Sequence, residues 1–273
     1  MTPLVEKYRP RKVTDFIGLA GPRAILGKLA EDPYPSAWLL VGPPGTGKTT
    51  MALALADQIG GDLHHIPSRR CDLEAVEHVC HKCLYHPWSG KWHTILIDEA
   101  DQMSRPAQLA FLSKLDATAA PPDTIFLFTA NDTALLENRF LSRCRRVHFQ
   151  TEGMTGPITT LLETVWKAEH NGHGKPDLGR LATEADGNVR NALMALEVEL
   201  LAPGHSAPAV LPHKSMTKRK QTGMPEHARV IPGIDLSSMG VRALRALCKQ
   251  FNVPIASYKR DVVNRLRQVM ETT

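Results

Sequence analysis

Over the first 150 residues, short apolar runs followed by turn residues alternate with longer stretches of helical spacing. Because the runs hardly alternate between apolar and polar positions, they predict strands that are buried on both faces. Apolar residues recur at helical spacing in the stretches 49–59 and 106–117. This order predicts an α/β fold, with a parallel sheet flanked by helices. The predicted strands are residues 37–41, 94–97, 124–129 and 147–149.

The pattern changes after residue 152, and the chain divides into four predicted parts. Residues 1–152 form the α/β domain. In residues 153–201 the apolar positions have only helical spacing, which predicts a small all-helical domain. Residues 202–232 are rich in proline and glycine and contain a Lys-Arg-Lys run, which is typical of a flexible basic linker. Helical spacing returns in residues 233–273, on either side of a break at Pro254.

Positive charge is concentrated at the C-terminal end of the chain. Residues 1–202 carry 21 Lys+Arg against 24 Asp+Glu, a net of −3, whereas residues 203–273 carry 12 against 4, a net of +8. A basic tail after a nearly neutral body indicates a polyanionic partner, and we expect DNA. No apolar run approaches the length of a membrane span, and the N-terminus lacks an apolar signal stretch. We therefore expect a cytoplasmic or nucleoid-associated protein without a membrane partner.

Residues 42–49 match the phosphate-binding loop G-x-x-x-x-G-K-[ST], between a predicted strand and a predicted helix. The glycines let backbone N–H groups surround phosphate oxygens, and the helix N-terminus adds its dipole. Lys48 would reach the β- and γ-phosphates, and the Thr49 hydroxyl would bind Mg²⁺. We therefore expect an ATP site formed by Gly42, Pro43, Pro44, Gly45, Thr46, Gly47, Lys48, Thr49 and Thr50.

Acidic and amide side chains follow the next two predicted strands. Asp98 and Glu99 come directly after an apolar run, at the sheet edge where ligands of open α/β sheets bind. Asp98 would hold Mg²⁺ together with Thr49, while Glu99 would orient and deprotonate the attacking water. Asn131 follows the next strand, where its amide would contact the γ-phosphate and that water.

Further motifs occur outside this site. The segments are Val-Glu-Lys-Tyr-Arg-Pro at residues 5–10 with Phe-Ile-Gly at 16–18, Leu-Ser-Arg-Cys at 141–144, and Gly-Asn-Val-Arg-Asn-Ala-Leu at 187–193. They resemble, in order, the N-terminus, the Ser-Arg-Cys motif and the sensor-two helix of clamp-loader ATPase subunits of the replication factor C type, a branch of the AAA+ family. With the phosphate loop and the acids, these motifs cover about 200 of the 273 residues.

The resemblance implies roles for individual residues. Asn131 would be the sensor-one residue, and Arg190 would contact the phosphates of its own subunit's nucleotide. Arg143 would be an arginine finger that reaches the ATP of a neighbouring subunit, a contact worth about 10³–10⁵ in rate. The residues implied near the adenine and ribose are Tyr8, Arg9, Pro10, Phe16 and Ile17.

The function implied is that of a clamp-loader subunit, an ATPase that acts in an oligomeric ring and loads a sliding clamp on primer–template DNA. Its partners would be the clamp, DNA, further copies of itself or other clamp-loader subunits. The roughly 40 residues after the linker are too few for the helical collar that normally holds such rings together. That departure keeps an alternative open, a helicase loader or another DNA-remodelling AAA+ ATPase. A DNA-binding adaptor with a nucleotide-operated switch is a third hypothesis.

Residues 234–268 resemble a SAP module, a small helix–turn–helix unit that binds DNA. Apolar residues at helical spacing would form its core, and basic residues would contact phosphates without reading bases. The basic residues expected to bind DNA are Arg242, Arg245, Lys249, Lys259, Arg260 and Arg265. The alternative is a basic helical hairpin that docks on another subunit.

The five cysteines of the chain are too few and too unevenly placed for a disulfide framework. Cys71, Cys80 and Cys83, with His78 and His86 nearby, invite a zinc interpretation. However, Cys80 and Cys83 share helical spacing with apolar neighbours, so we favour buried thiols on one helix face. The remaining histidines, among them His64, His65 and His93, are expected at the surface or hydrogen-bonded in the core.

A chain ending at residue 202 tests the DNA-binding tail. We expect it to bind primed DNA more weakly than the full chain does. Its affinity should also depend less steeply on salt, because fewer counterions are released when fewer phosphates are neutralised. Fluorescence anisotropy titrations at several salt concentrations measure both quantities. Equal affinities and equal salt slopes for the two proteins would exclude the tail as the DNA tether.

Overall fold

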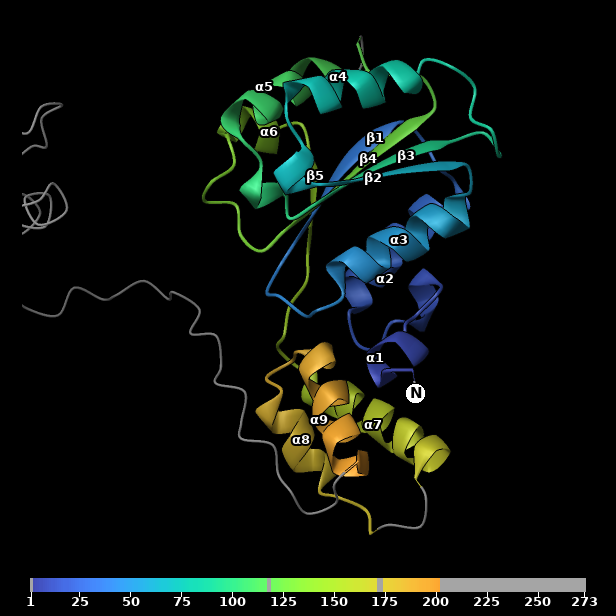
Figure 1. The fold of residues 1–273 in the computed structure, drawn as a ribbon, viewed down its shortest axis with the longest axis vertical. Helices are drawn as coiled ribbons and strands as arrows, with labels where there is room; N and C mark the ends of the chain where they lie inside the picture. The colour runs from blue at the N-terminus through green and yellow to red at the C-terminus, as the bar shows by residue number, and fades with distance from the viewer. Residues whose placement is uncertain (1, 117–118, 171–173, 202–273) are drawn as a thin grey trace, which may run out of the picture. The chain divides into compact units, whose positions relative to one another are not determined.

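The computed structural model describes residues 2–116, 119–170 and 174–201. Within this part of the chain, five parallel strands form one sheet in the order β2-β3-β4-β1-β5 (Figure 1). The strands are β1 (Ser36–Val41), β2 (Asp62–Pro67), β3 (His93–Asp98), β4 (Thr124–Ala130) and β5 (Arg145–His148). The predicted α/β fold with a parallel sheet is confirmed. The expected DNA-binding residues, from Arg242 to Arg265, lie outside the described residues.

Helices cover both faces of the sheet (Figure 1), because alternate residues of each strand point into opposite layers. Trp38 and Leu40 of β1 belong to one apolar core, whereas Leu39 and Val41 belong to the other. The first core includes residues of α2 (Ala20–Glu31) and α3 (Lys48–Ile59), and the second includes residues of α4 (Leu73–Lys82), α5 (Arg105–Lys114) and α6 (Asn138–Leu141). The short remaining elements of this domain are α1 (Leu4–Lys7), η1 (Val13–Asp15), η2 (Ser68–Arg70) and η3 (Ala100–Gln102).

Strand β2 was not predicted, and its position explains why. It lies at the edge of the sheet and pairs only with β3. Its sequence, Asp-Leu-His-His-Ile-Pro, alternates between half-buried and exposed residues instead of forming an apolar run. Strand β5, predicted at residues 147–149, begins two residues earlier with exposed arginines. The guanidinium of Arg145 lies 5.6 Å from the ring centroid of Trp38, on the neighbouring strand β1.

Phenylalanine side chains fill the core between the sheet and helix α5. Phe111 of α5 is fully buried, and its ring centroid lies 6.1 Å from that of Phe126 and 5.2 Å from that of Phe128. Phe140 of α6 packs edge-on against Phe128 with centroids 4.9 Å apart. Such edge-to-face contacts stabilise a core beyond simple burial. They fix the layer that supports β3 and β4, whose carboxyl ends carry the predicted acids and amide.

The residues after the sheet form α7 (Thr155–Glu169), α8 (Leu178–Glu184) and α9 (Val189–Leu201). Helical spacing in residues 158–168 and 188–201 predicts α7 and α9, whereas α8 has no such predicted segment. Its N-cap, Asp177, accepts a hydrogen bond from the backbone N–H of Arg180 over 2.9 Å. Ile158 of α7, Leu181 of α8 and Leu196 of α9 pack in one apolar core. Among the described residues, no helix combines the length and apolar character needed to cross a bilayer.

Candidate functional site

The loop at residues 42–49 connects the end of β1 to the start of α3. Gly45 and Gly47 have φ values of 77° and 92°, in the left-handed region that glycine adopts without strain. Gly42 faces another constraint, because an added Cβ would lie 2.2 Å from the carbonyl oxygen of Phe149. Two backbone conformations and one close approach thus require these glycines, and the loop holds its N–H groups at the N-terminus of α3.

Lys48 lies at the floor of this loop, with its ammonium group held by three oxygen acceptors. It donates hydrogen bonds to the backbone oxygens of Gly42 and Pro43 over 2.7 and 2.8 Å, and to Oδ1 of Asn131 over 3.2 Å. Burial lowers the pKa of Lys48 to about 8, an effect that the charges of Asp101 and Asp98 partly offset. The structure therefore brings together the predicted lysine and the predicted amide.

Asp98, at the end of β3, joins two hydroxyl groups from different elements. Its Oδ1 accepts hydrogen bonds from Thr49 Oγ1 and from Thr129 Oγ1, each over 2.6 Å. Thr49 lies in the first turn of α3 and Thr129 near the end of β4, so one carboxylate oxygen links the loop to the central strands. Carboxylate and hydroxyl oxygens are the hard ligands that Mg²⁺ prefers, and the pair fits the predicted cation.

Glu99 follows Asp98 in a backbone conformation that is unusual for its residue type. Its φ of 55° lies in the left-handed region, which costs a non-glycine residue roughly 1 kcal/mol or more. The Glu99 N–H donates to Thr129 Oγ1 over 3.0 Å, and its side chain is exposed at the lip of the site. The carboxylate is therefore free to act on a bound ligand while its backbone is fixed.

Two positioning residues were missed by the sequence analysis. Thr129 carries the hydrogen bonds that fix Asp98 and Glu99. Asp101 is only 6% exposed, and its Oδ1 accepts the backbone N–H of Asn131 over 3.3 Å. Asp101 stands in the same acidic run as the predicted carboxylates, and Thr129 directly follows the apolar part of a predicted strand. Both are polar residues at or just after the end of a predicted strand, and this position is the sequence feature by which they could have been identified.

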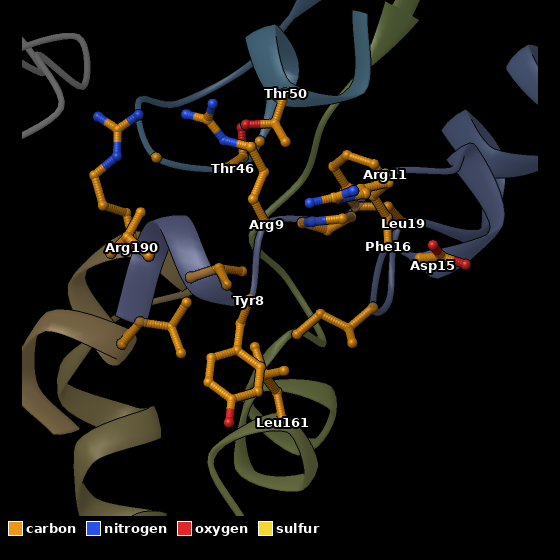
Figure 2. Close-up of a pocket in the computed structure, with 17 residues that line it drawn as sticks. Tyr8, Arg9, Arg11, Asp15, Phe16, Leu19, Thr46, Thr50, Leu161 and Arg190 are labelled. Atoms are coloured by element: carbon orange, nitrogen blue, oxygen red, sulfur yellow. The ribbon is translucent and has the colours of Figure 1, made fainter. Parts of the chain in front are cut away.

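The polar groups line a cavity of about 290 Å³ between the loop and the ends of β3 and β4. A second cavity of about 390 Å³ adjoins it and is largely apolar (Figure 2). Its walls contain all five residues that the resemblance places near adenine and ribose: Tyr8, Arg9, Pro10, Phe16 and Ile17. Gly45, Gly47, Thr50 and Arg190 line both cavities. The two spaces together have the polarity of a nucleotide, with an apolar end for a base and a polar end for phosphates.

Tyr8 contributes its ring rather than its hydroxyl to the apolar cavity. In Figure 2 the hydroxyl points away from Thr46 and Thr50. It donates a hydrogen bond to Glu169 at the end of α7. Burial, followed by this hydrogen bond and the Glu169 charge, raises the pKa of Tyr8 to about 12. The tyrosine thereby connects the N-terminal segment to the helical region.

The helical region contacts the phosphate-binding loop directly. Asn188 Nδ2 donates to the carbonyl oxygen of Pro44 over 3.3 Å, and an added Cβ on Gly45 would lie 2.1 Å from Asn188 Oδ1. Asn188 Oδ1 in turn accepts the N–H of Asn191 over 3.1 Å, at the start of α9. Arg190, in the same turn of chain, extends toward the loop in Figure 2. Asn188 belongs to the quoted 187–193 motif, but its contact with the loop was not foreseen.

Arg143 lines neither of the two cavities. Its Nε and one terminal nitrogen donate to the two oxygens of Asp116, over 2.7 and 3.2 Å. Its other terminal nitrogen donates to the carbonyl oxygen of Arg139 over 3.1 Å. The carboxylate holds the guanidinium in a fixed orientation, and the Arg143 side chain remains 30% exposed.

The cysteines of the predicted helix face are buried, as favoured, although the face is narrower than expected. The predicted face also includes Leu73, Val76 and Leu84, which share this helical spacing. Val76, Cys80 and Cys83 are buried, whereas Leu73 and Leu84 are 48% and 59% exposed. Cys71 is also buried, and its Sγ lies 3.8 Å from the sulfur of Met103. Burial raises the pKa values of Cys71, Cys80 and Cys83 to about 12, 11 and 12.

Comparison with known proteins agrees with this geometry. Residues 38–151 match the family described as ATPase family associated with various cellular activities (AAA). The chain therefore carries an AAA ATPase domain. Replication factor C subunit 2 of Arabidopsis thaliana is 32% identical over 205 residues, which are 71% of this chain and 60% of the relative. Replication factor C subunit 4 of Saccharomyces cerevisiae is 27% identical over 212 residues, covering 74% and 64%.

The chain thus spans about three-fifths of the length of these curated relatives. Among solved structures, the RuvB Holliday junction branch migration motor of Thermotoga maritima superposes with a TM-score of 0.57 at 17% identity, over 70% of this chain and 64% of the other. At that identity the similarity shows a common fold. The resemblance to replication factor C subunits therefore rests on the relatives at higher identity.

The pKa of Lys48 predicts how ATP affinity depends on pH. In the protein without nucleotide, Lys48 has a pKa of about 8. Bound phosphates would raise this pKa because they favour the ammonium form. Binding should therefore take up a proton, so that affinity is full below pH 8 and falls as pH rises above it. Calorimetric titration with ATP at several pH values, in buffers of different ionisation enthalpy, measures affinity and proton uptake. A constant affinity from pH 7 to 9 without proton uptake would contradict the assignment of Lys48.

Proposed function

We propose that this protein is an ATP-hydrolysing subunit of a sliding-clamp loader that acts in DNA replication. The observation that carries the proposal is the convergence of Lys48, Asp98, Glu99 and Asn131 at one sheet edge, beside a cavity suited to a nucleotide base. An ATPase site in an AAA domain fits many cellular tasks. The names of the relatives, replication factor C subunits, favour clamp loading over the helicase-loader alternative.

ATP would lie across both cavities. Its base enters the apolar cavity against Tyr8, Phe16 and Ile17, and its phosphates lie along the N–H groups of residues 45–49. Lys48 exchanges its hydrogen bonds to Gly42 and Pro43 for phosphate oxygens. Thr49 and Asp98 would hold Mg²⁺, which would neutralise charge on the terminal phosphates.

Hydrolysis needs a water in line with the γ-phosphate and a group that takes its proton. Glu99 is the acid whose side chain is exposed in this site, so it serves as the general base. Asn131 is held by Asp101 through its backbone and by Lys48 through its side chain, and it positions the γ-phosphate and water. Arg190 compensates phosphate charge and couples the helices α7–α9 to the state of the nucleotide.

Arg143 completes the site of a neighbouring subunit. In its own chain the guanidinium lines neither cavity. Its contacts with the Asp116 carboxylate and the Arg139 carbonyl keep the side chain ordered, and the side chain is 30% exposed. Placing this cation against the γ-phosphate of another subunit requires an oligomer, composed of copies of this chain or of related subunits.

Large apolar side chains are exposed directly after α4, where a partner protein could bind. Leu84, Tyr85 and Trp88 are 59%, 65% and 100% exposed, which groups three large apolar residues within five positions. Aromatic residues of this kind dominate the energetics of protein interfaces. We assign this segment, residues 84–88, to contact with the sliding clamp, while the basic tail engages DNA.

The proposal is tested by ATP hydrolysis of the purified full chain, measured alone, with primed DNA, and with primed DNA plus the sliding clamp of the same organism. We expect DNA to stimulate hydrolysis and the clamp to stimulate it further. Glu99→Gln should bind ATP but lose at least about 100-fold in turnover, because the general base is missing. Glu152→Gln, at an exposed position away from both cavities, is the matched control and should retain full activity.

Different outcomes separate the hypotheses. Trp88→Ala is expected to lose stimulation by the clamp while keeping stimulation by DNA. If DNA stimulated the normal chain but the clamp had no effect, the helicase-loader or DNA-remodelling alternative would replace clamp loading. If no mixture hydrolysed ATP, the chain would be an adaptor or would require another subunit for activity.

Mixing two inactive variants tests the role of Arg143. Lys48→Ala lacks a working site of its own but still carries Arg143, whereas Arg143→Ala keeps its site and lacks the finger. In an oligomer of this chain, mixed subunits should recover part of the activity that both variants lose. Arg139→Ala, one helical turn away, is the control and should hydrolyse ATP normally. Absence of recovery, in mixtures that form oligomers, would place the finger on a different subunit or residue.

A further inference from the structure

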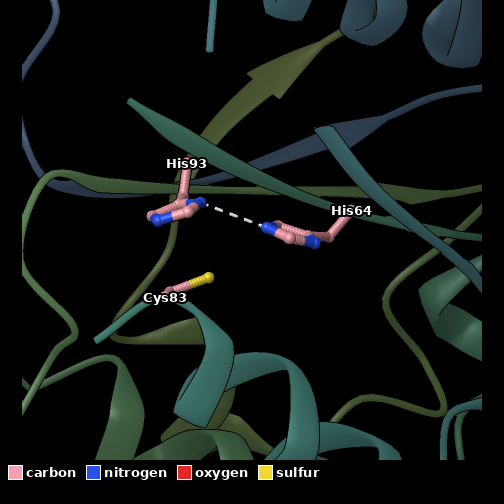
Figure 3. Close-up of side chains that lie close together, drawn as sticks. All are labelled: His64, Cys83 and His93. Atoms are coloured by element: carbon pink, nitrogen blue, oxygen red, sulfur yellow. Dashed lines mark hydrogen bonds between the residues drawn. The ribbon is translucent and has the colours of Figure 1, made fainter. Parts of the chain in front are cut away.

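We propose that His64, Cys83 and His93 form a Zn²⁺ site at the edge of the sheet, separate from the nucleotide site. The ligand atoms of these three side chains all lie within 4.8 Å of one another. In Figure 3 the sulfur of Cys83 points toward the two imidazole rings. This set differs from the cysteine-rich one considered from the sequence, because among the described residues Cys71 and Cys80 do not join it.

The topology brings these residues together. His93 begins β3 opposite Asp62, and His64 lies two residues further along β2, so both rings reach the same face of the sheet. That face is covered by α4, which ends at Lys82 with Cys83 as its C-cap. Cys83 is fully buried and His93 is only 3% exposed, whereas His64 is half-buried on the edge strand. Two strands and a helix terminus therefore each contribute one ligand.

The distances suit a tetrahedral ion after small adjustments. His64 Nε2 and His93 Nδ1 are 3.1 Å apart. Two nitrogen ligands on tetrahedral zinc are roughly 3.3 Å apart, and nitrogen and sulfur ligands roughly 3.6 Å apart, given the usual bond lengths. The nitrogens are thus already spaced for the ion. From separations of at most 4.8 Å, the sulfur needs to approach the nitrogens by at most about 1.2 Å, which a side-chain rotation supplies.

A second interaction presets His93 for metal binding. Its Nε2 lies 2.8 Å from the carbonyl oxygen of Tyr85. A carbonyl oxygen can only accept a hydrogen bond, so His93 must be the donor. This contact therefore places the proton on Nε2 and leaves the lone pair on Nδ1 facing His64. Zinc-bound histidines are commonly held in this way by a carbonyl or carboxylate partner. Without metal, Nδ1 would instead accept a hydrogen bond from His64 Nε2, so the site remains satisfied when empty.

The residue types of this site suit a cation that binds neutral imidazole and thiolate. Binding releases the thiol proton of Cys83 to solvent as the sulfur–metal bond forms. Two nitrogens and one sulfur match the ligand preference of Zn²⁺, and a water would occupy the fourth position. Asp62, whose charge acts on both His64 and Cys83, would balance the charge of the ion.

The ion would tie the end of α4 to the sheet. Cys83 directly precedes the exposed apolar segment 84–88, and the Tyr85 carbonyl binds the ligand His93. The N–H of Trp88 donates to Asp62 over 2.9 Å, which adds a contact between the segment and β2. Zinc would therefore hold the segment in one conformation. The effect of zinc on clamp contact rests on the proposed function, whereas the metal site itself is independent of that proposal.

The experiment measures zinc in the full-length protein, purified after growth with added zinc and passed over a sizing column with a weak chelator. We expect about one zinc per chain, and replacement by Co²⁺ should give the charge-transfer absorption of a cobalt–thiolate bond. His64→Gln should lower metal affinity at least about tenfold. It should still fold, because glutamine can donate the hydrogen bond to His93 and β2 is an edge strand.

Two matched variants keep the test specific. His65→Gln changes the next residue of β2, whose side chain is exposed on the opposite face, and should bind zinc normally. Cys80→Ala removes a buried thiol from the same helix and should keep the cobalt–thiolate absorption, whereas Cys83→Ser should abolish it. Zinc far below one per chain in the unmodified protein would overturn the proposal. Equal loss of zinc in His64→Gln and His65→Gln would overturn it as well, whatever the ATPase measurements show.

Discussion

One carboxylate oxygen, Oδ1 of Asp98, holds the nucleotide site together. It accepts hydrogen bonds from Thr49 at the start of α3 and from Thr129 at the end of β4. The same Thr129 hydroxyl accepts the N–H of Glu99, which fixes the strained turn that exposes the Glu99 side chain. The positions of the proposed base, the proposed metal ligands and the phosphate loop therefore all depend on the alignment of two parallel strands. The packed phenylalanine layer below α5 maintains that alignment.

The helices after the sheet contribute to the site through the backbone of the loop as well as through charge. Asn188 reaches the carbonyl of Pro44 and leaves no room for a side chain on Gly45. Arg190 faces both cavities from the same turn of chain. A nucleotide between these groups would contact the sheet and the helices at once. This arrangement gives a physical basis for coupling nucleotide state to the helical region.

Strand β3 connects the two sites inferred in this protein. Its last residue, Asp98, belongs to the nucleotide site, and its first residue, His93, belongs to the proposed zinc site. Five residue steps of extended strand separate them by roughly 17 Å. Ile95, Leu96 and Ile97 between them are fully buried, so the strand is a rigid element. The nucleotide site and the exposed apolar segment after α4 are therefore attached to opposite ends of one inflexible strand.

The sequence determined the parallel α/β fold, the phosphate loop and the order of the acids, because each depends on local residues and on chain direction. It did not reveal β2, since an edge strand with alternating burial lacks an apolar run. Thr129, Asp101 and Asn188 acquire their roles only from partners that are distant in sequence. The cluster of His64, Cys83 and His93 depends on the register between β2 and β3. The positions of the histidines in the sequence do not give that register. Chemistry within a motif can thus be predicted from sequence, whereas contacts between motifs were decided by the tertiary structure, because packing alone sets which strand ends and helix ends meet.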